Sequence, residues 1–496
     1  MIFAPKLSMA SVAVAMGVLS VFIPEIAAAQ ADPTDRRLIE RGRQLFMDET
    51  FDGNGRTCAS CHPPTNNFTI DPDFIASLPD DDPLFVAEFN PDLAGLEDPE
   101  MMRDFGLILE NADGLDKAGV FRGIPHTLGL RVSTAVNPAG DDDLTRADGS
   151  TVRDATGWSG DGAPGDGSLR SFATGAVIQH FPKTTNRVEG QDFRLPTAAE
   201  LDALEAFQLS LGRQREIDLA TMNFADPDVQ TGKDLFDGVG INRGCSFCHS
   251  NAGANDADGF NRNFATNAAN LTDMEARRSH PGMPGDGGFG QEPEFQVRGI
   301  APKFHGNGSM NTPSLVEAAD TGPFFHNNSA KTIEDAVRFY TTSTFSSDDP
   351  FQLSGAQVSQ LAAFLRALNP LENVRNVGVL AEDAQRQREE RARQTIQVVI
   401  ADTDDAIEVL TSGPLDLYPE AVGLLDQALL LAEDARVSEE TATRNALLGQ
   451  VRDLMRDIPD LILLAPPEAE IAEGDAAPPV PGDTAASSGD QAGGGA

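Results

Sequence analysis

Apolar side chains recur at helical spacing in two segments that lie far apart along the chain, 196–212 and 353–370. The recurring apolar positions are Leu201, Leu204, Phe207 and Leu211 in the first segment, and Val358, Leu361, Phe364 and Leu368 in the second. Each pattern predicts a helix that presents one stripe to a hydrophobic core. A capping box of Thr197 and Glu200 should open the first helix, and Pro370 should close the second.

A second kind of pattern repeats ahead of these helices. The stretch "RGRQLFMDETFDGNGRTCASCH" at 41–62 aligns with "TGKDLFDGVGINRGCSFCHS" at 231–250. Both place a Gly-x-x-Leu-Phe segment, expected to be helical, shortly before Cys-x-x-Cys-His. Together with the later helices, this repeat predicts two similar units that meet near 223–229.

The segments between the repeated motifs and the closing helices are rich in Gly, Asp, Asn and Pro, for example at 137–150 and 280–295. Such long segments are predicted to be loops that cover or build a site. From Leu371 to 464 the pattern changes to charged amphipathic helices, which should pack as a small bundle on the second unit or on a partner. The Pro-, Ala- and Gly-rich tail at 465–496 is expected to be disordered.

Residues 1–31 have the character of a secretory signal. Lys6 precedes an apolar run from Met9 to Ile23, and small residues follow, with cleavage expected near Ala29 or Ala31. The apolar run is shorter than the roughly 20 residues that a membrane span needs. We therefore expect a periplasmic or secreted protein without a membrane span.

The net charge of the chain limits the classes of partner that it can bind. The chain has 77 acidic and 37 basic residues, a net charge of −40, which argues against nucleic acid and anionic membranes. The excess of acidic residues serves either solubility or attraction of a cationic partner, and the sequence leaves both open.

The chain has four cysteines, and all four belong to the repeated pentapeptide. The two sets are Cys58, Cys61 and His62, and Cys245, Cys248 and His249. A zinc ribbon places its two knuckles roughly 15 to 20 residues apart, far closer than these motifs. A redox dithiol needs no histidine next to it, whereas covalent attachment of haem uses both thiols and the imidazole. The motifs therefore predict two haem c groups, with zinc or a structural disulfide as the less favoured alternatives.

A helix, a haem motif and a closing helix are the parts of a cytochrome c domain. We therefore expect an all-α protein with two cytochrome c domains in tandem, long loops and a helical C-terminal extension. The expected limits are 1–31 for the signal peptide, 32–225 and 226–370 for the two domains, 371–464 for the extension and 465–496 for the tail.

Residues 310–340, "MNTPSLVEAADTGPFFHNNSAKTIEDAVRFY", resemble a segment of the bacterial di-haem cytochrome c peroxidase family, which includes MauG. The resemblance extends over about 35–370. It implies that the N-terminal haem is the reactive one and that the C-terminal haem stores or relays electrons. The family also binds calcium between its domains, so the resemblance implies one calcium ion here, with no ligands assigned.

The resemblance also implies roles for two aromatic residues. Trp158, the single tryptophan, matches the tryptophan between the haems; the alternative is a loop tryptophan packed for burial. Tyr340 matches the sixth ligand of the C-terminal haem, which is methionine in the peroxidases and tyrosine in MauG-type enzymes. The alternative is that Tyr340 is a core residue and Met310 or Met283 is the ligand.

The expected pocket of the N-terminal haem departs from the family. Phe172 stands at the position of a glutamine that assists peroxide cleavage, and the accompanying glutamate is not evident in the sequence. Apolar distal pockets favour binding of O₂, and this feature resembles rubber oxygenases. His126 or His180 could cap the N-terminal iron, close it to substrate or donate a proton, or have a plain hydrogen-bonding role. By the resemblance, His326 matches the Phe-His-Asp-Gly turn of the family, in which Asn327 replaces the aspartate.

These features predict a haem oxidoreductase in which electrons pass from the C-terminal haem through Trp158 to an open N-terminal iron. That iron would reduce peroxide or activate O₂, with a redox protein as donor or acceptor. The alternatives are a di-haem dioxygenase of the rubber-oxygenase type and a non-enzymatic electron carrier. Ligation separates them, because an enzyme needs one open or labile iron and a carrier has two firmly six-coordinate ones.

Overall fold

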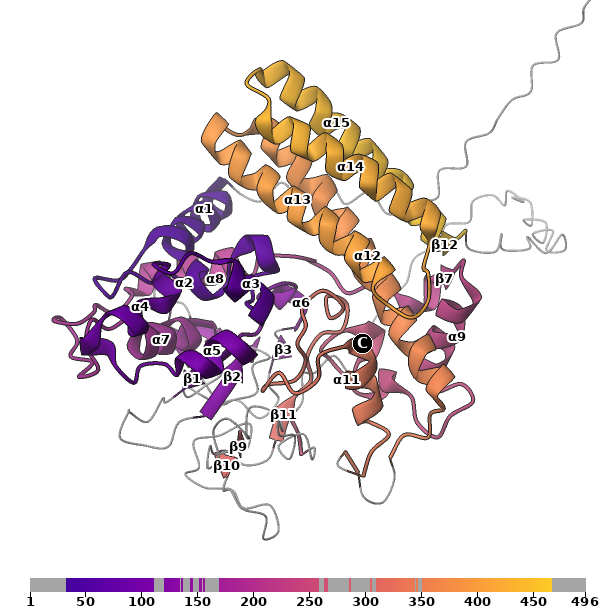
Figure 1. The fold of residues 1–496 in the computed structure, drawn as a ribbon, viewed down its shortest axis with the longest axis horizontal. Coiled ribbons are helices and arrows are strands. Elements are labelled where there is room, and N and C mark those ends of the chain that lie inside the picture. The colour runs from indigo at the N-terminus through magenta and orange to yellow at the C-terminus, as the bar shows by residue number, and fades with distance from the viewer. Residues whose placement is uncertain are drawn as a thin grey trace, which may run out of the picture.

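A computed structural model describes residues 33–110, 120–133, 135–136, 143–145, 151–153, 155–156, 169–257, 263–265, 285–286, 304–305, 309–343, 345–346 and 350–465. The chain is mostly helical with few short strands, which confirms the all-α prediction at that level (Figure 1). The signal segment, Trp158 and Met283 lie outside the described residues. Among the described residues, no helix is both long enough and apolar enough to cross a membrane.

The main helices are α1 (Pro33–Asp48), α7 (Leu169–His180), α8 (Ala198–Gln208), α9 (Pro227–Phe236), α11 (Ile333–Phe339), α12 (Gly355–Arg386), α13 (Glu389–Thr411), α14 (Pro419–Val437) and α15 (Thr441–Asp457). Short helical turns are α2 (Cys58–Cys61), η1 (Pro64–Asn66), α3 (Pro72–Ser77), η2 (Pro83–Phe85), α4 (Val86–Phe89), η3 (Pro91–Leu93), α5 (Pro99–Phe105), α6 (Leu130–Ser133), η4 (Leu219–Thr221), η5 (Cys245–Phe247), η6 (Ser250–Ala252) and α16 (Pro459–Ile462).

Among the described residues, the short strands pair in twos. Antiparallel pairs form between β1 (Leu107–Glu110) and β2 (Val120–Gly123), β3 (Ala135–Val136) and β6 (Ala155–Thr156), β4 (Asp143–Thr145) and β5 (Thr151–Arg153), and β8 (Asn263–Ala265) and β11 (Ser309–Asn311). β9 (Gly285–Asp286) pairs in parallel with β10 (Phe304–His305). β12 (Leu463–Leu464) pairs with β7 (Asn223–Phe224), which ties the end of the described chain to the segment between the two repeats.

The first repeat is built on a close pairing of α1 with α8. A Cβ on Gly42 of α1 would lie 1.8 Å from the carbonyl oxygen of Ala203 and 2.7 Å from Cβ of Phe207, so only glycine allows this approach. Phe46, one turn further along α1, packs edge-on against Phe207 with ring centroids 5.2 Å apart. The predicted capping box of Thr197 at the start of α8 is confirmed.

The second repeat uses the same device between α9 and α12. A Cβ on Gly232 would lie 2.0 Å from the carbonyl oxygen of Gln360 and 2.8 Å from Cβ of Phe364. Phe236 packs against Phe364 with ring centroids 5.3 Å apart. The internal repeat seen in the sequence is therefore present in the structure as two equivalent helix pairs.

The prediction that Pro370 closes the second helix is wrong. α12 continues through Pro370 to Arg386. An interior proline costs about 3 kcal/mol, but Val374 and Val377 beyond it are buried, and burying each such side chain contributes about 1.5–3 kcal/mol. Packing against the later helices offsets the lost hydrogen bond, so the helix goes on.

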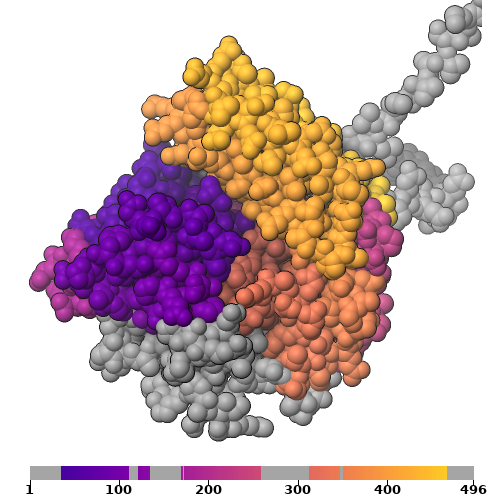
Figure 2. Space-filling view, in the orientation of Figure 1, coloured from indigo at the N-terminus to yellow at the C-terminus, as the bar shows by residue number. Residues whose placement is uncertain are grey.

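The extension is a bundle of the second half of α12 with α13, α14 and α15. Alanines with no exposed surface line its helix contacts, among them Ala381, Ala406, Ala428 and Ala432. Their buried side chains belong to the same hydrophobic cluster as Phe224, Phe236 and Phe364 of the second repeat. Of the two alternatives, packing on the second unit or on a partner, the structure shows the first. Figure 2 shows that the extension, in orange and yellow, also lies against the indigo N-terminal part.

Candidate functional site

The first cysteine motif presents a neutral imidazole. Cys58 and Cys61 lie in α2, and His62 follows at the end of that turn. The pKa of His62 is lowered to about 4, mainly by burial; the carbonyl of Phe68 opposes this effect, and the nearby imidazoles of His126 and His180 add to it. Nδ1 of His62 lies 2.8 Å from that carbonyl oxygen and donates to it, so Nε2 keeps its lone pair for a ligand.

The second motif has the same arrangement. Cys245 begins η5, and Cys248 and His249 follow it. Nδ1 of His249 donates to the carbonyl oxygen of Pro313 at 3.0 Å, and burial lowers the pKa of this imidazole to about 4. Pro313 belongs to the segment 310–340 that carries the family resemblance, so that segment helps to orient the histidine.

All four cysteines lie in the described part of the chain, and each is a free thiol. Burial raises the pKa of Cys58 to about 12, of Cys61 to about 11 and of Cys245 to about 12. Two such thiols beside an imidazole with a free Nε2 fit covalent haem at each motif.

A buried charge network lies beside the first motif. The side chains of Arg56 and Glu97 are both 1% exposed, and Nη1 of Arg56 lies 2.8 Å from Oε1 of Glu97. Nδ1 of His180 lies 3.3 Å from the same oxygen. The other carboxylate oxygen of Glu97 accepts a hydrogen bond from the backbone N–H of Leu109 at 3.0 Å. Glu97 is thus held on three sides, and it is the residue that sequence reasoning missed.

The end of α7 is attached directly to the loop that precedes the first motif. The side-chain amide of Asn54 donates to the carbonyl oxygen of His180 at 2.9 Å. The backbone N–H of Asn54 donates to the carbonyl oxygen of Phe181 at 2.8 Å. These bonds, with the electrostatic effect of His180 on His62, place the imidazole of His180 in the surroundings of the first motif.

Phe172 lies on the same helix, two turns before His180, and is half-buried. Its predicted place in the pocket of the N-terminal iron stays a prediction, as does the bridging role of Trp158. Met310 lies in β11, and the position of its side chain is outside what the structure describes.

His126 is buried beside a charged pair that joins the two repeats. The backbone N–H of Leu128 donates to Nδ1 of His126 at 3.3 Å, so the imidazole proton is on Nε2. Burial lowers the pKa of His126; Glu317 opposes this effect and Arg213 adds to it. Nη1 of Arg213 lies 2.7 Å from Glu317, and both side chains are 2% exposed. His126 is therefore a neutral imidazole near this contact.

Tyr340 lies next to the second motif. It follows α11 and packs against Phe345 and Phe351, with ring centroids 4.9 and 5.9 Å away. Burial raises the pKa of its hydroxyl, and Cys245 and Cys248 raise it further. In this setting the phenol is neutral, and ligation by phenolate would have to be driven by ferric iron. Its role as a ligand stays a prediction.

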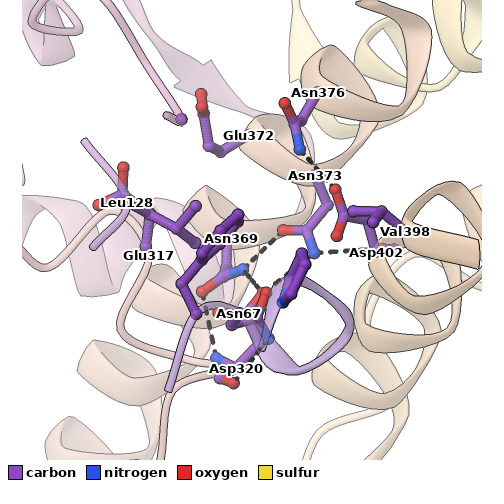
Figure 3. Close-up of a pocket in the computed structure, with 13 residues that line it drawn as sticks. Asn67, Leu128, Glu317, Asp320, Asn369, Glu372, Asn373, Asn376, Val398 and Asp402 are labelled. Carbon is purple, nitrogen blue, oxygen red and sulfur yellow. Dashed lines mark hydrogen bonds between the residues drawn. The ribbon is translucent and has the colours of Figure 1, made fainter. Parts of the chain in front are cut away.

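Where the extension meets both repeats, the structure has a small polar cavity (Figure 3). It holds about 400 Å³ of empty space, part of it open to solvent, and Asn67, Asp320, Asn369, Asn373 and Asp402 are among the residues lining it. Burial raises the pKa of Asp320 to about 7 and that of Asp402 to about 7. Both carboxyls accept hydrogen bonds from asparagine amides, which partly oppose that rise.

No group of three or more His, Cys, Asp or Glu side chains in the described part of the chain is arranged to hold a metal ion. The calcium ion implied by the resemblance therefore has no assigned ligands within those ranges.

The chain is similar to one named protein over most of its length. It is 24% identical over 379 residues to the cytochrome-c peroxidase IdrP1 of Denitromonas iodatirespirans, a match that covers 71% of this chain and 86% of that protein. No protein-family model matches the chain. This relative supports the resemblance to cytochrome c peroxidases. It does not test the resemblance to MauG or to rubber oxygenases.

Proposed function

We propose that this protein is a di-haem c-type cytochrome oxidoreductase of the cytochrome c peroxidase type, which reduces peroxide at the N-terminal haem. The similarity to a cytochrome-c peroxidase and the two equivalent cysteine motifs support this proposal. Electrons would pass from the C-terminal haem through Trp158, and a redox protein would resupply them. The predicted signal segment supports a location in the periplasm or outside the cell, which is part of this proposal.

The residues that would hold the N-terminal haem are Cys58, Cys61 and His62, and the residues for the C-terminal haem are Cys245, Cys248 and His249. Bound haem supplies the iron that takes up the oxidant and exchanges single electrons. The chain itself has to move protons, because reduction of one peroxide to two waters consumes two of them.

The observation that carries the proposal is the pairing of His180 with Glu97 beside the first motif. An ionised carboxylate only accepts hydrogen bonds, so the proton of a neutral His180 is on Nδ1 and Nε2 has a free lone pair. Nε2 can take a proton from one peroxide oxygen and return it to the other. A positioned acid or base contributes about 10²- to 10⁴-fold to such a step.

Arg56 stabilises the ionised form of Glu97, the partner of His180. It donates to Glu97 and, through the same guanidinium group, to the carbonyl oxygen of Leu84 at 2.6 Å. Because Glu97 stays ionised next to Arg56, the tautomer of His180 is fixed. In the family, a glutamine assists this proton transfer, and Phe172 stands at its position here. We propose that the pair of His180 and Glu97 takes over that role.

Stopped-flow mixing of the reduced protein with peroxide, and separately with O₂, tests the proposal. We expect His180→Gln to slow peroxide reduction by about 10²-fold, and Phe172→Gln to leave it equal or faster. His326→Gln, which alters a half-buried histidine on another loop, is the control and should react as the wild type does. A wild type that turns over peroxide rapidly, with no change in His180→Gln, would refute the pocket assignment.

The oxygenase alternative rests on Phe172, an apolar side chain on α7 where peroxidases have a polar one. It predicts that the reduced protein reacts with O₂ faster than with peroxide and that Phe172→Gln lowers this reaction. A protein that reacts with neither oxidant, and whose two irons are both firmly six-coordinate, would be an electron carrier.

A further inference from the structure

Helix α13 of the extension reaches the loop that follows the first cysteine motif. The side-chain amide of Asn67 donates to Oδ2 of Asp405 in α13 at 3.0 Å, and to the backbone carbonyl oxygen of Asp320 at 3.1 Å. Asn67 is 7% exposed. A single buried amide therefore joins the N-terminal repeat, the C-terminal repeat and the extension.

The loop at this contact has an unfavourable backbone. Asn67 and Phe68 both have a φ of 54°, in the left-handed region that side chains other than glycine rarely adopt. Asparagine tolerates this conformation, but phenylalanine does so poorly. Two such residues in a row persist only where surrounding contacts hold them.

The carbonyl group at the end of this turn is the one that binds the proximal histidine. Phe68 donates its backbone N–H to the carbonyl oxygen of Pro63 at 3.0 Å, and its own carbonyl oxygen accepts from Nδ1 of His62 at 2.8 Å. The conformation of the turn thus decides where that acceptor lies. A chain of contacts runs from Asp405 through Asn67 and Phe68 to His62.

The second motif has a similar turn held in a different way. Asn251 and Ala252 after His249 also have left-handed φ values of 52° and 55°. Oδ1 of Asn251 accepts a hydrogen bond from the backbone N–H of Leu219 at 3.2 Å. The carbonyl oxygen of Ala252 accepts one from the backbone N–H of Leu315 at 2.8 Å. These partners lie outside the helical extension, so a change in α13 offers a way to alter one motif selectively.

We propose that the helical extension clamps the proximal turn of the N-terminal haem, with Asp405 as the positioning residue that fixes Asn67 and thereby the acceptor for His62. The proposal rests on the proposed function, in which His62 binds the N-terminal iron. An imidazole whose N–H is bound by a carbonyl group is a more basic ligand and favours ferric iron. The extension therefore keeps the reduction potential of this haem low.

Potentiometric titration of both haems in Asp405→Ala tests the clamp. Without the carboxylate that holds Asn67, the Phe68 carbonyl is no longer fixed opposite His62. The reduction potential of the N-terminal haem should therefore shift upward, and that of the C-terminal haem should stay unchanged. Resonance Raman spectra of the reduced protein should show a lower iron–histidine stretching frequency at the same haem, because the ligand is a weaker donor. A purely structural role for Asp405 would move neither of these signals selectively.

Two further variants separate the hydrogen bond from the charge. Asp405→Asn keeps an oxygen acceptor for Asn67, so its potentials should match those of the wild type. Asp404→Ala removes a carboxyl group from the exposed neighbouring position of α13 and should also leave both potentials unchanged. If Asp405→Asn shifts the potential as far as Asp405→Ala does, charge and not the clamp is responsible, and the inference is wrong.

Haem content distinguishes failure of this inference from failure of the proposed function. The pyridine haemochrome of the wild type should correspond to two haems per chain. One haem or none would overturn the proposed function and this inference with it. Two haems with unchanged potentials in Asp405→Ala would overturn the clamp alone. If Asp405→Ala does not fold, the shifted or unshifted potential of Asp405→Leu decides the same question.

Discussion

Nδ1 of His180 lies 3.3 Å from Oε1 of Glu97, a residue 83 positions earlier in the chain. Burial would raise the pKa of Glu97, but Arg56 and His180 hold it below its usual value, so the carboxylate is ionised at neutral pH. The pair joins the end of α7 to the segment before α5. In a neutral His180, this contact fixes the proton on Nδ1.

Replacing Glu97 by glutamine should slow peroxide reduction by about 10- to 100-fold, the usual effect of removing a partner that orients a histidine. Glutamine keeps the size of the side chain but does not fix the proton of His180 on Nδ1. Steady-state rates with a reduced cytochrome donor measure the effect. Glu88→Gln, which alters a partly exposed ion pair with Arg103, should keep the wild-type rate. Equal rates in both variants would contradict a role for Glu97.

The buried pair of Arg213 and Glu317 should contribute strongly to stability. Glu317→Gln leaves the buried guanidinium group of Arg213 with Glu216, 3.6 Å away and partly exposed, as its remaining carboxylate partner, and should cost up to about 3–5 kcal/mol of unfolding free energy. Glu382→Gln removes an exposed partner of Arg386 and should cost less than about 1 kcal/mol. Denaturant unfolding of the two variants measures both values. Similar losses in both would show that the contact between the repeats is not held by this pair.

The unfolding free energy should depend on pH through Asp402. Burial raises the pKa of this carboxyl to about 7 in the folded protein, whereas its ordinary value is 3.8. The folded state therefore binds the proton more tightly, and the stabilisation it gives is complete below about pH 4 and is lost as the pH rises to about 7. Asp402→Asn should remove this part of the pH dependence, and Asp404→Asn should keep it. The assignment would be contradicted if the unfolding free energy of the wild type rose between pH 4 and 7 and followed the same curve as that of Asp402→Asn.

Tyr340→Phe tests the predicted ligand of the C-terminal haem. Removing the oxygen donor should convert the low-spin EPR signal of this haem to a high-spin or weak-ligand form and raise its potential. Tyr418→Phe changes the other tyrosine, which lies in the extension, and should leave the spectrum unaltered. If the spectrum of Tyr340→Phe is also unaltered, Tyr340 is only a member of the aromatic cluster with Phe345 and Phe351.

Local patterns predicted local structure well. The capping box at Thr197 begins α8 as expected, because both of its hydrogen bonds form within one turn. The two Gly-x-x-Leu-Phe segments form helices, and Gly42 and Gly232 occupy matching close contacts. The cysteine motifs could be recognised because all their ligand atoms lie within five residues of each other.

The errors arose where distant packing decides the outcome. Pro370 was expected to end a helix, but burial against α13 and α15 carries α12 onward. The contact of Asp405 with Asn67 joins residues 338 positions apart, and no local pattern predicts it. These contacts depend on how the extension lies across both repeats.

Glu97 was missed for a related reason. It precedes Asp98, whose side chain accepts from the N–H groups of Glu100 and Met101 and caps α5. In the sequence the two acidic residues therefore resemble one polar turn on the surface. Only the folding of this segment against Arg56 and α7 shows that Glu97 is buried.

The most direct test of the central claim is an anaerobic titration of the fully reduced protein with hydrogen peroxide, followed at the absorption bands of reduced c-type haem. Reduction of one peroxide takes two electrons, and each of two haems gives one. We expect both haems to be oxidised and the end point to lie at one peroxide per chain. An end point at half a peroxide per chain, or no oxidation in excess peroxide, would contradict it.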